Sequence, residues 1–262
     1  MHSKGGVVVV VFVVANRKGG VGKSITASSI YNWLERAGNK TLLVDLDSQS
    51  NVSYAYGIDV IANPEILTIA DVFSGDSTLQ KVMQSKSDYG FIVPAGEKLV
   101  DYDDGTEKFK IDLKSALKSV SADFDFCVID APPSLGRLTV SALVAGDYLV
   151  IPAQADIFSV QGLNSMKKII ESVKEVNKGL TVSGILLTRN NDRLILTKAL
   201  TDLLDETAKS LGTKIFKTFI REGVAVREAS AQQIGLFDYD VKLKTNVAKD
   251  YDNFIRELLG VN

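Results

Sequence analysis

Apolar runs of strand length alternate along the chain with segments in which apolar residues recur at helical spacing. The run Val7–Val14 precedes a predicted helix, Lys23–Ala37, with Ile30, Trp33 and Leu34 on its core face. The same pattern predicts further strands over Lys40–Val44, Gly90–Ala95 (a short strand leaving the sheet), Asp125–Asp130, Tyr148–Pro152, Thr181–Thr188 and Lys214–Phe219. Further helices are predicted over Leu67–Phe73, Ile111–Val120, Leu138–Ala145, Phe158–Val176, a segment ending at Leu211, Val224–Gln233 and Asn246–Leu259.

This alternation favours an α/β fold, a mostly parallel, twisted sheet with helices on both faces. The polar run Asp101–Glu107 is predicted to be a solvated loop. Because the sequence has no repeat, low-complexity tract or linker, we expect a single domain over residues 1–262. Only a few residues precede the first strand, so we expect no N-terminal helix-turn-helix.

Composition excludes several classes of function. Hydrophobic residues make up 45% of the chain and charged residues 24%, as in ordinary soluble proteins. The net charge of −2 means that any nucleic-acid binding must come from a local basic patch. One cysteine, Cys127, and one histidine, His2, argue against disulfides, iron–sulfur clusters and histidine-based catalysis. Val7–Ala15 is too short to span a bilayer and polar Asn16 follows it, so we expect a cytoplasmic protein.

The segment between the first predicted strand and helix has the composition of a phosphate-binding P-loop. Its glycines, Gly19, Gly20 and Gly22, let the backbone curl so that successive N–H groups point at phosphate oxygens. The following helix adds its positive N-terminal end. Lys23 then supplies a charge for the β- and γ-phosphates, and Ser24 a hydroxyl ligand for Mg²⁺. ATP and Mg²⁺ are the predicted cofactors.

Carboxylates end two of the predicted strands, where parallel sheets bind their ligands. Asp45 and Asp47 follow the strand Lys40–Val44, and beside a P-loop we expect them to position water and contact Mg²⁺. Asp130 ends an apolar strand in the Walker B arrangement, in which the carboxylate holds Mg²⁺ through water. The prolines that follow, at positions 132 and 133, fix an extended exit from the strand.

Three strings carry a family resemblance. KGGVGKS, at 18–24, resembles the deviant Walker A box of the ParA/MinD class of ATPases. DLDSQSN, at 45–51, resembles the family's D-x-D-P-Q-x-N segment, with Ser48 in place of the usual proline. Residues 128–134 resemble the family's apolar-strand-D-x-P-P-S segment. The chain is therefore identified as a ParA-type partition ATPase, the short form without a helix-turn-helix, and the resemblance extends from Val7 to the last helix.

The resemblance implies ATP-dependent homodimerisation, cooperative non-specific DNA binding, and slow ATP hydrolysis stimulated by a ParB-like centromere-binding partner. The cargo would be a plasmid or chromosome, and the ATP-bound protein would associate with the nucleoid rather than a membrane. Lys18, Lys23 and Asp47 take the catalytic roles, with Lys18 reaching across the dimer to the partner's nucleotide and Asp47 handling water.

The remaining site residues follow from the same resemblance. Nucleotide contacts fall on Lys18, Gly19, Gly20, Val21, Gly22, Lys23, Ser24 and Ile25, with Arg189 and Asn190 near the adenine. Metal contacts fall on Ser24, Asp45 and Asp130. Arg193 matches a family position for DNA contact, whereas Arg221 and Arg227 are displaced candidates, and ordinary solvated arginines are the alternative interpretation.

Three other classes of protein share the P-loop and are alternatives to this identification. A MinD-like positioning ATPase needs a basic amphipathic C-terminal helix, but the last predicted helix carries Asp250, Asp252 and Glu257. A nitrogenase-reductase-like electron donor needs cluster cysteines, which this chain lacks. A P-loop kinase remains an alternative, because the motifs indicate ATP and not the group that accepts phosphate.

Overall fold

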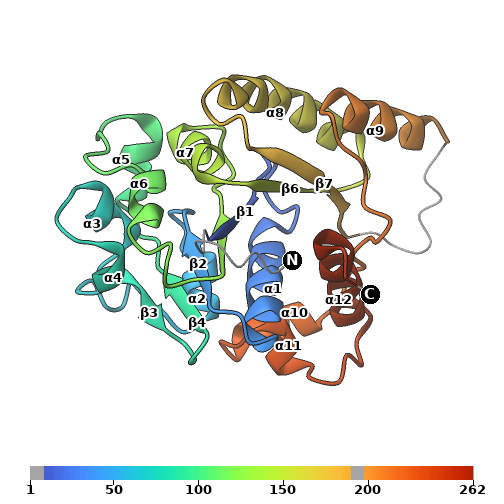
Figure 1. The fold of residues 1–262 in the computed structure, drawn as a ribbon. Helices are drawn as coiled ribbons and strands as arrows, with labels where there is room; N and C mark the ends of the chain where they lie inside the picture. The colour runs from blue at the N-terminus through green and yellow to red at the C-terminus, as the bar shows by residue number, and fades with distance from the viewer. Residues whose placement is uncertain (1–8, 190–197, 262) are drawn as a thin grey trace.

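The computed structural model describes residues 9–189 and 198–261, and a seven-stranded sheet lies at the centre of this part of the chain (Figure 1). The strand order is β3-β4-β2-β5-β1-β6-β7, and all neighbours run parallel except the edge pair β3–β4. The predicted fold class, a mostly parallel α/β sheet, is therefore confirmed. The strands are β1 (Val10–Val14), β2 (Thr41–Asp45), β3 (Gln84–Ser85), β4 (Gly90–Val93), β5 (Phe126–Asp130), β6 (Tyr148–Ala153) and β7 (Thr181–Leu187).

Strand β1 lies between β5 and β6, so both of its edges are paired, and the helices packed on each side of the sheet bury both of its faces. Its side chains alternate between the two cores of the molecule. Val11 and Val13 pack in one core, and Phe12 and Val14 pack in the other. An uninterrupted apolar run is what such a central parallel strand requires.

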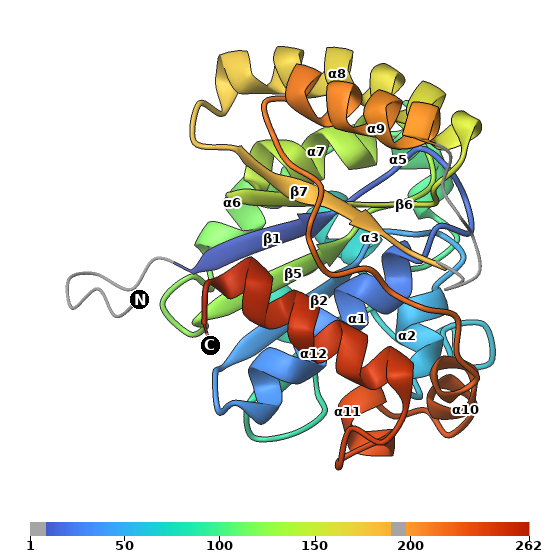
Figure 2. The same ribbon diagram turned by 90° about the vertical axis from the view of Figure 1, so that its right-hand side faces the viewer.

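Helices cover both faces of the sheet. In Figures 1 and 2, α7, α8 and α9 lie over one face, and α1, α10, α11 and α12 lie over the other. The helices are α1 (Lys23–Arg36), α2 (Asn51–Ala55), α3 (Ile69–Phe73), α4 (Leu79–Val82), α5 (Leu99–Asp104), α6 (Leu113–Lys118), α7 (Arg137–Ala145), α8 (Ile157–Val176), α9 (Lys198–Ser210), α10 (Ala225–Ala231), α11 (Leu236–Tyr239) and α12 (Asn246–Leu259). Within the described ranges, no helix is both long enough and apolar enough to cross a bilayer.

The predicted strand over Lys214–Phe219 is wrong. This segment makes a single parallel bridge to β7, between Ile215 and Ile185. Farther along, Glu257 of α12 accepts the backbone N–H groups of Lys217 and Thr218, at 2.9 and 3.0 Å. Because the Glu257 carboxylate takes the Thr218 N–H, the regular ladder is interrupted there. The next bond to β7 is the one that the Ile220 N–H donates to the Leu187 carbonyl, at 2.8 Å.

The predicted solvated loop over Asp101–Glu107 is wrong for its first half, which belongs to α5, whereas Thr106 and Glu107 are exposed and lie outside any helix. Asp103 accepts hydrogen bonds from the Ser134 hydroxyl, at 2.6 Å, and from the Leu138 N–H, at 3.0 Å. This segment thereby holds the chain that leaves β5. Likewise, β4 does not leave the sheet but pairs with β2 along its whole length. The short elements β3, α2, α4 and α11 were not predicted.

Candidate nucleotide-binding site

The glycine-rich loop connects the carboxyl end of β1 to the N-terminus of α1. Gly20 and Gly22 adopt φ angles of 73° and 86°, in the left-handed region that side chains with a Cβ rarely enter. Gly22 is also the residue that caps α1, and its carbonyl accepts the Thr26 N–H at 3.0 Å. The two glycines therefore let the loop curl tightly and pass directly into the helix.

Seven successive backbone N–H groups of this loop, from Gly19 to Ile25, donate to no acceptor within the described residues. The curl begins one residue earlier, where the Lys18 N–H donates to Asn16 Oδ1 at 3.1 Å. Unpaired N–H groups that converge at a helix N-terminus form a binding site for an anion, since both the donors and the helix dipole favour negative charge.

Lys23 lies beneath the loop and is only 6% exposed. Its ammonium donates to the Lys18 carbonyl at 3.3 Å, a long hydrogen bond. Burial lowers the pKa of Lys23, whereas the neighbouring carboxylates of Asp130 and Asp47 act in the opposite direction. A buried ammonium held so weakly by the protein is suited to bind an added anion.

Asp130, at the end of β5, is fully buried, and neither of its oxygens accepts a hydrogen bond from a described residue. Burial raises the pKa of Asp130 well above its ordinary value, and the charge of Asp45 adds to the rise. The Ser24 hydroxyl and the Lys23 ammonium oppose it. A buried carboxylate whose oxygens accept no hydrogen bond from a described residue favours an added cation.

Asp45 is buried beside Asp130 but is fully hydrogen-bonded. Its Oδ2 accepts the Ser53 N–H, at 2.9 Å, and the Ser53 hydroxyl, at 2.7 Å, while its Oδ1 accepts the Asp47 N–H at 3.0 Å. Burial raises the pKa of Asp45 to about 6 despite these bonds. Asp47 is 8% exposed, and its Oδ1 accepts the Gln49 N–H at 3.0 Å. Asp45 therefore shapes the turn that carries Asp47.

The residues present fit a Mg²⁺ ion only together with a nucleotide. Within the described residues, no group of three or more acidic, histidine or cysteine side chains could hold a metal ion alone. Asp130 offers two unpaired oxygens and Ser24 a partly exposed hydroxyl. Mg²⁺ binds through few carboxylates when phosphate oxygens and waters complete its shell, so this pair is sufficient.

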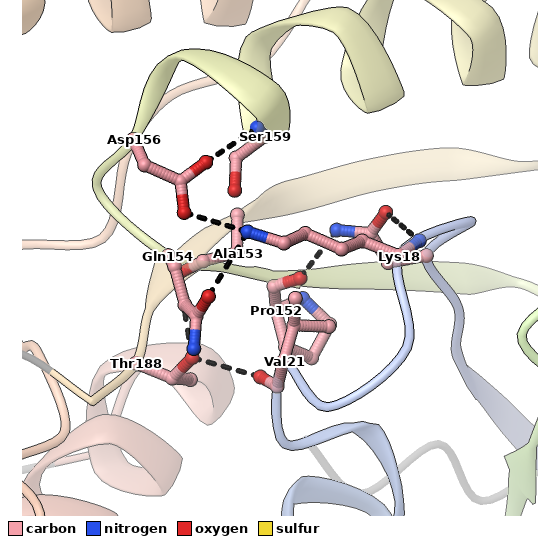
Figure 3. A network of polar contacts seen from close by, with 9 residues as sticks. Lys18, Val21, Pro152, Ala153, Gln154, Asp156, Ser159 and Thr188 are labelled. Atoms are coloured by element: carbon pink, nitrogen blue, oxygen red, sulfur yellow. Dashed lines mark hydrogen bonds and ion pairs between the residues drawn. The ribbon is translucent and has the colours of Figure 1, made fainter.

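Lys18 does not point to the phosphate site of its own chain but lies along the start of α8 (Figure 3). Its ammonium lies 2.6 Å from Asp156 Oδ2 and 3.0 Å from Gln154 Oε1. Asp156 is also the N-cap of α8, since its Oδ1 accepts the Ser159 N–H at 2.8 Å. Lys18 is thereby held by an ion pair whose two side chains are each about one-third exposed.

A cavity of about 380 Å³ adjoins the loop at the end of β7. Its apolar lining includes Ile25, Val226 and Tyr251, and its arginines are Arg189, Arg221 and Arg227. A purine has an apolar face and a polar edge, so a cavity with both kinds of lining next to a phosphate site suits a nucleoside.

Comparisons with known proteins agree with this geometry. A family model described as an AAA domain matches residues 9–182. The chain is similar to the chromosome-partitioning ATPase Soj of Treponema pallidum, with 32% identity over 254 residues, which are 95% of this chain and 96% of that protein. The chromosome partitioning protein ParA of Myxococcus xanthus is 31% identical over 243 residues, which are 89% of this chain and 83% of that protein. The chain belongs to the Soj/ParA family of ATPases.

A solved structure supports the same assignment of the fold. Cobyrinic acid a,c-diamide synthase from Mycobacterium smegmatis, with a bound ATP analog and magnesium, has a TM-score of 0.80 and 27% identity. The match covers 96% of this chain and 94% of that one. ATPase chemistry is thus supported at the level of the Soj/ParA family.

The arginines predicted to contact DNA have different surroundings. Arg193, like the adenine candidate Asn190, lies outside the described residues. Arg221 forms a two-pronged ion pair with Asp250 of α12, at 2.9 and 2.6 Å. Arg227 is exposed and lines the same cavity as Arg189. Arg221 and Arg227 therefore lie beside the cavity that adjoins the glycine-rich loop.

Sequence reasoning missed the residues that support the motifs. Asp156 and Gln154 hold Lys18, Ser53 holds Asp45, and Thr188 holds the glycine-rich loop. Asp156 could have been recognised as a helix N-cap, because Asp followed three residues later by Ser precedes an apolar helix. The other contacts join distant parts of the sequence, and local patterns carry no signal for them.

Proposed function

We propose that this chain is an ATP-dependent DNA-partition ATPase that hydrolyses ATP to ADP and phosphate. It dimerises when ATP is bound, binds DNA without sequence preference in that state, and is returned to monomers by hydrolysis that a ParB-like partner stimulates. The cargo is a plasmid or chromosome, and the ATP-bound protein resides on the nucleoid. Membership of the Soj/ParA family supports this proposal.

The observation that carries the proposal is an anion site next to a cation site. The seven unpaired N–H groups of the glycine-rich loop and the Lys23 ammonium favour binding of an anion. The Asp130 carboxylate, whose charge interacts with that of Lys23, favours an added cation. A Mg²⁺–nucleotide complex supplies both charges at once.

Ser24 and Asp130 would hold the Mg²⁺ ion, with Asp45 as a further candidate through its position beside Asp130. When bound, Mg²⁺ would neutralise negative charge on the β- and γ-phosphates. Lys23 binds the same phosphates from the protein side. Asp47, held by the turn that Asp45 shapes, orients the attacking water, a contribution of positioning rather than charge.

Lys18 acts on the partner's nucleotide in the ATP dimer. The ion pair with Asp156 supports this assignment, because within one chain the Lys18 ammonium is directed to α8 rather than to its own phosphate site. On dimerisation Lys18 exchanges Asp156 for the partner's phosphates. An exposed ion pair of this kind is worth less than about 1 kcal/mol, so the exchange is inexpensive.

Two lysine substitutions test the phosphate site. Lys23→Ala should lower ATP affinity at least about tenfold, because a charge-assisted hydrogen bond contributes roughly 1.5–3 kcal/mol. Lys18→Ala should leave single-chain affinity near normal and abolish ATP-driven dimerisation and hydrolysis. Calorimetry and light scattering measure the two effects, with exposed Lys118→Ala as the control. Equal loss of affinity in both variants would contradict the role of Lys18 in trans.

A binding experiment tests the cargo. DNA binding is compared in ATP, in ADP and in a slowly hydrolysed ATP analogue, with anionic liposomes in a parallel series. Binding to DNA only with a triphosphate supports a partition ATPase. Nucleotide-independent behaviour would favour a P-loop kinase, and triphosphate-dependent binding to liposomes would favour a MinD-like protein.

A further inference from the structure

Thr188 lies at the carboxyl end of β7 and is only 3% exposed. Its hydroxyl donates to the Val21 carbonyl, at 2.8 Å, across a sequence separation of 167 residues (Figure 3). A second, weaker contact to the Ala153 carbonyl is 3.4 Å long. The Thr188 N–H donates to the same Ala153 carbonyl at 2.8 Å, so the backbone of Thr188 continues the β6–β7 ladder. The side chain is therefore free to serve the glycine-rich loop.

The bond to Val21 fixes one peptide plane of the loop. In a trans peptide the C=O and the following N–H point in opposite directions. A Val21 carbonyl held toward Thr188 therefore places the Gly22 N–H on the opposite side of the loop. This N–H is one of the seven that donate to no described residue. Because glycine rotates easily about its backbone bonds, the plane has no strong preference of its own and needs such an anchor.

The loop is anchored at both ends by the strands β6 and β7. At its start, the Asn16 side chain donates to the Pro152 carbonyl at 2.6 Å and accepts the Lys18 N–H. At its end, Thr188 holds Val21. Thr188 also lines the 380 Å³ cavity, directly before Arg189. One residue thus joins the phosphate-binding loop to the cavity that suits a nucleoside.

We infer that Thr188 is a positioning residue for the nucleotide phosphates: its hydroxyl fixes the Val21–Gly22 peptide so that the Gly22 N–H faces the bound phosphate. The inference rests on the proposed nucleotide-binding function and adds a residue that belongs to none of the phosphate-binding motifs. Thr188 touches no phosphate itself and acts through the backbone of Val21.

Three variants separate positioning from general stability. Thr188→Val keeps the shape of the side chain but leaves the buried Val21 carbonyl without its donor, whereas Thr188→Ser keeps the hydroxyl. Thr213→Val is the matched control, because Thr213 makes the same kind of bond, to the Val182 carbonyl at 2.7 Å, far from the glycine-rich loop. Affinities for fluorescent ATP and ADP are measured with Mg²⁺, and urea unfolding is measured without nucleotide.

Thr188→Val is expected to weaken ATP and ADP about five- to tenfold and equally, since both carry the β-phosphate that the loop holds. Thr188→Ser should restore binding, and Thr213→Val should bind normally although it also loses a hydrogen bond from a threonine hydroxyl to a backbone carbonyl. Unchanged affinity in Thr188→Val, or equal weakening in Thr213→Val, would overturn this inference and leave the proposed function standing. If the unmodified chain bound neither nucleotide, the proposed function would fail, and the inference with it.

Discussion

Asp130→Asn should stabilise the nucleotide-free protein while destroying its Mg²⁺-dependent activity. Asp130 is fully buried, accepts no hydrogen bond from a described residue, and lies beside the buried carboxyl of Asp45. Its pKa is raised by burial and by Asp45, so ionisation costs free energy in the folded state that it does not cost in the unfolded state. An amide has no charge to ionise.

Asp45 indicates the size of the effect. Burial raises the pKa of Asp45 from 3.8 to about 6, and at 1.36 kcal/mol per pH unit this costs about 3 kcal/mol once the carboxyl is ionised. Asp130 lies in the same surroundings without the hydrogen bonds that help Asp45. Allowing about 1 kcal/mol for an unpaired Asn amide, we expect Asp130→Asn to be about 1–2 kcal/mol more stable at pH 7.5.

The pH dependence gives the decisive sign. Well below the ordinary aspartate pKa of 3.8 the carboxyl is protonated in both the folded and the unfolded protein, so the wild type has no penalty and the advantage of the variant disappears. As pH rises, the wild type loses the stability that ionisation of Asp130 costs, so the difference in stability between the two proteins grows in favour of the variant. Urea unfolding from pH 4 to pH 8 measures this difference. With Mg²⁺–ATP the order should reverse, because only the wild type gains stability by binding the complex.

The control for this experiment is Asp250→Asn. Asp250 is also a buried carboxylate, but it is paired with Arg221 at 2.6 Å, so its loss should destabilise the protein. A variant at Asp130 that was less stable than the wild type by the same amount at every pH would refute the reasoning. That result would mean that Asp130 is held by protein donors rather than awaiting a cation.

Three further expectations follow from particular contacts. Asp156→Ser keeps the helix cap but releases Lys18, so light scattering should detect ATP-driven dimers at two- to fivefold lower protein concentration. Asp47→Ala should stop phosphate release while the ATP dimer persists, as measured by its dissociation rate. Gly136→Ala places a Cβ against the Asp103 carboxylate and should cost about 1–3 kcal/mol in urea unfolding, whereas a neutral effect would contradict the close contact.

The sequence predicted most of the fold because burial leaves a local pattern. The apolar run of β1 and the periodic face of α1 are consequences of where these elements lie in the sheet. The strand wrongly predicted over Lys214–Phe219 has the same apolar character. What limits its pairing with β7 to a single bridge is Glu257, a residue 40 positions away from Lys217 that accepts N–H groups of the segment. Periodicity indicates whether a segment can form a strand, but it does not identify the groups that hydrogen-bond to the backbone of that segment in the fold.

The same distinction applies to the site. Lys18, Lys23 and Asp130 stand out in the sequence because their chemistry requires fixed residue types at fixed spacing. The residues that hold these motif residues in place do not stand out in the sequence. A hydroxyl or carboxylate can approach the loop from any element that the fold brings near. Asp156 lies 138 residues from Lys18, and Thr188 lies 167 residues from Val21. Such contacts become visible only when the strands are placed side by side.

Two buried groups of the candidate site, Lys23 and Asp130, favour added charge of opposite sign. Burial shifts the pKa values of Lys23 and Asp130 in opposite directions, downward for the lysine and upward for the carboxyl, so both groups are biased toward their neutral forms. A phosphate beside Lys23 favours the ammonium, and a divalent cation beside Asp130 favours the carboxylate. Either ligand alone would relieve one of these penalties and leave the other. The arrangement therefore favours the metal–nucleotide complex over its separate parts, which is what the proposed ATP-dependent function requires.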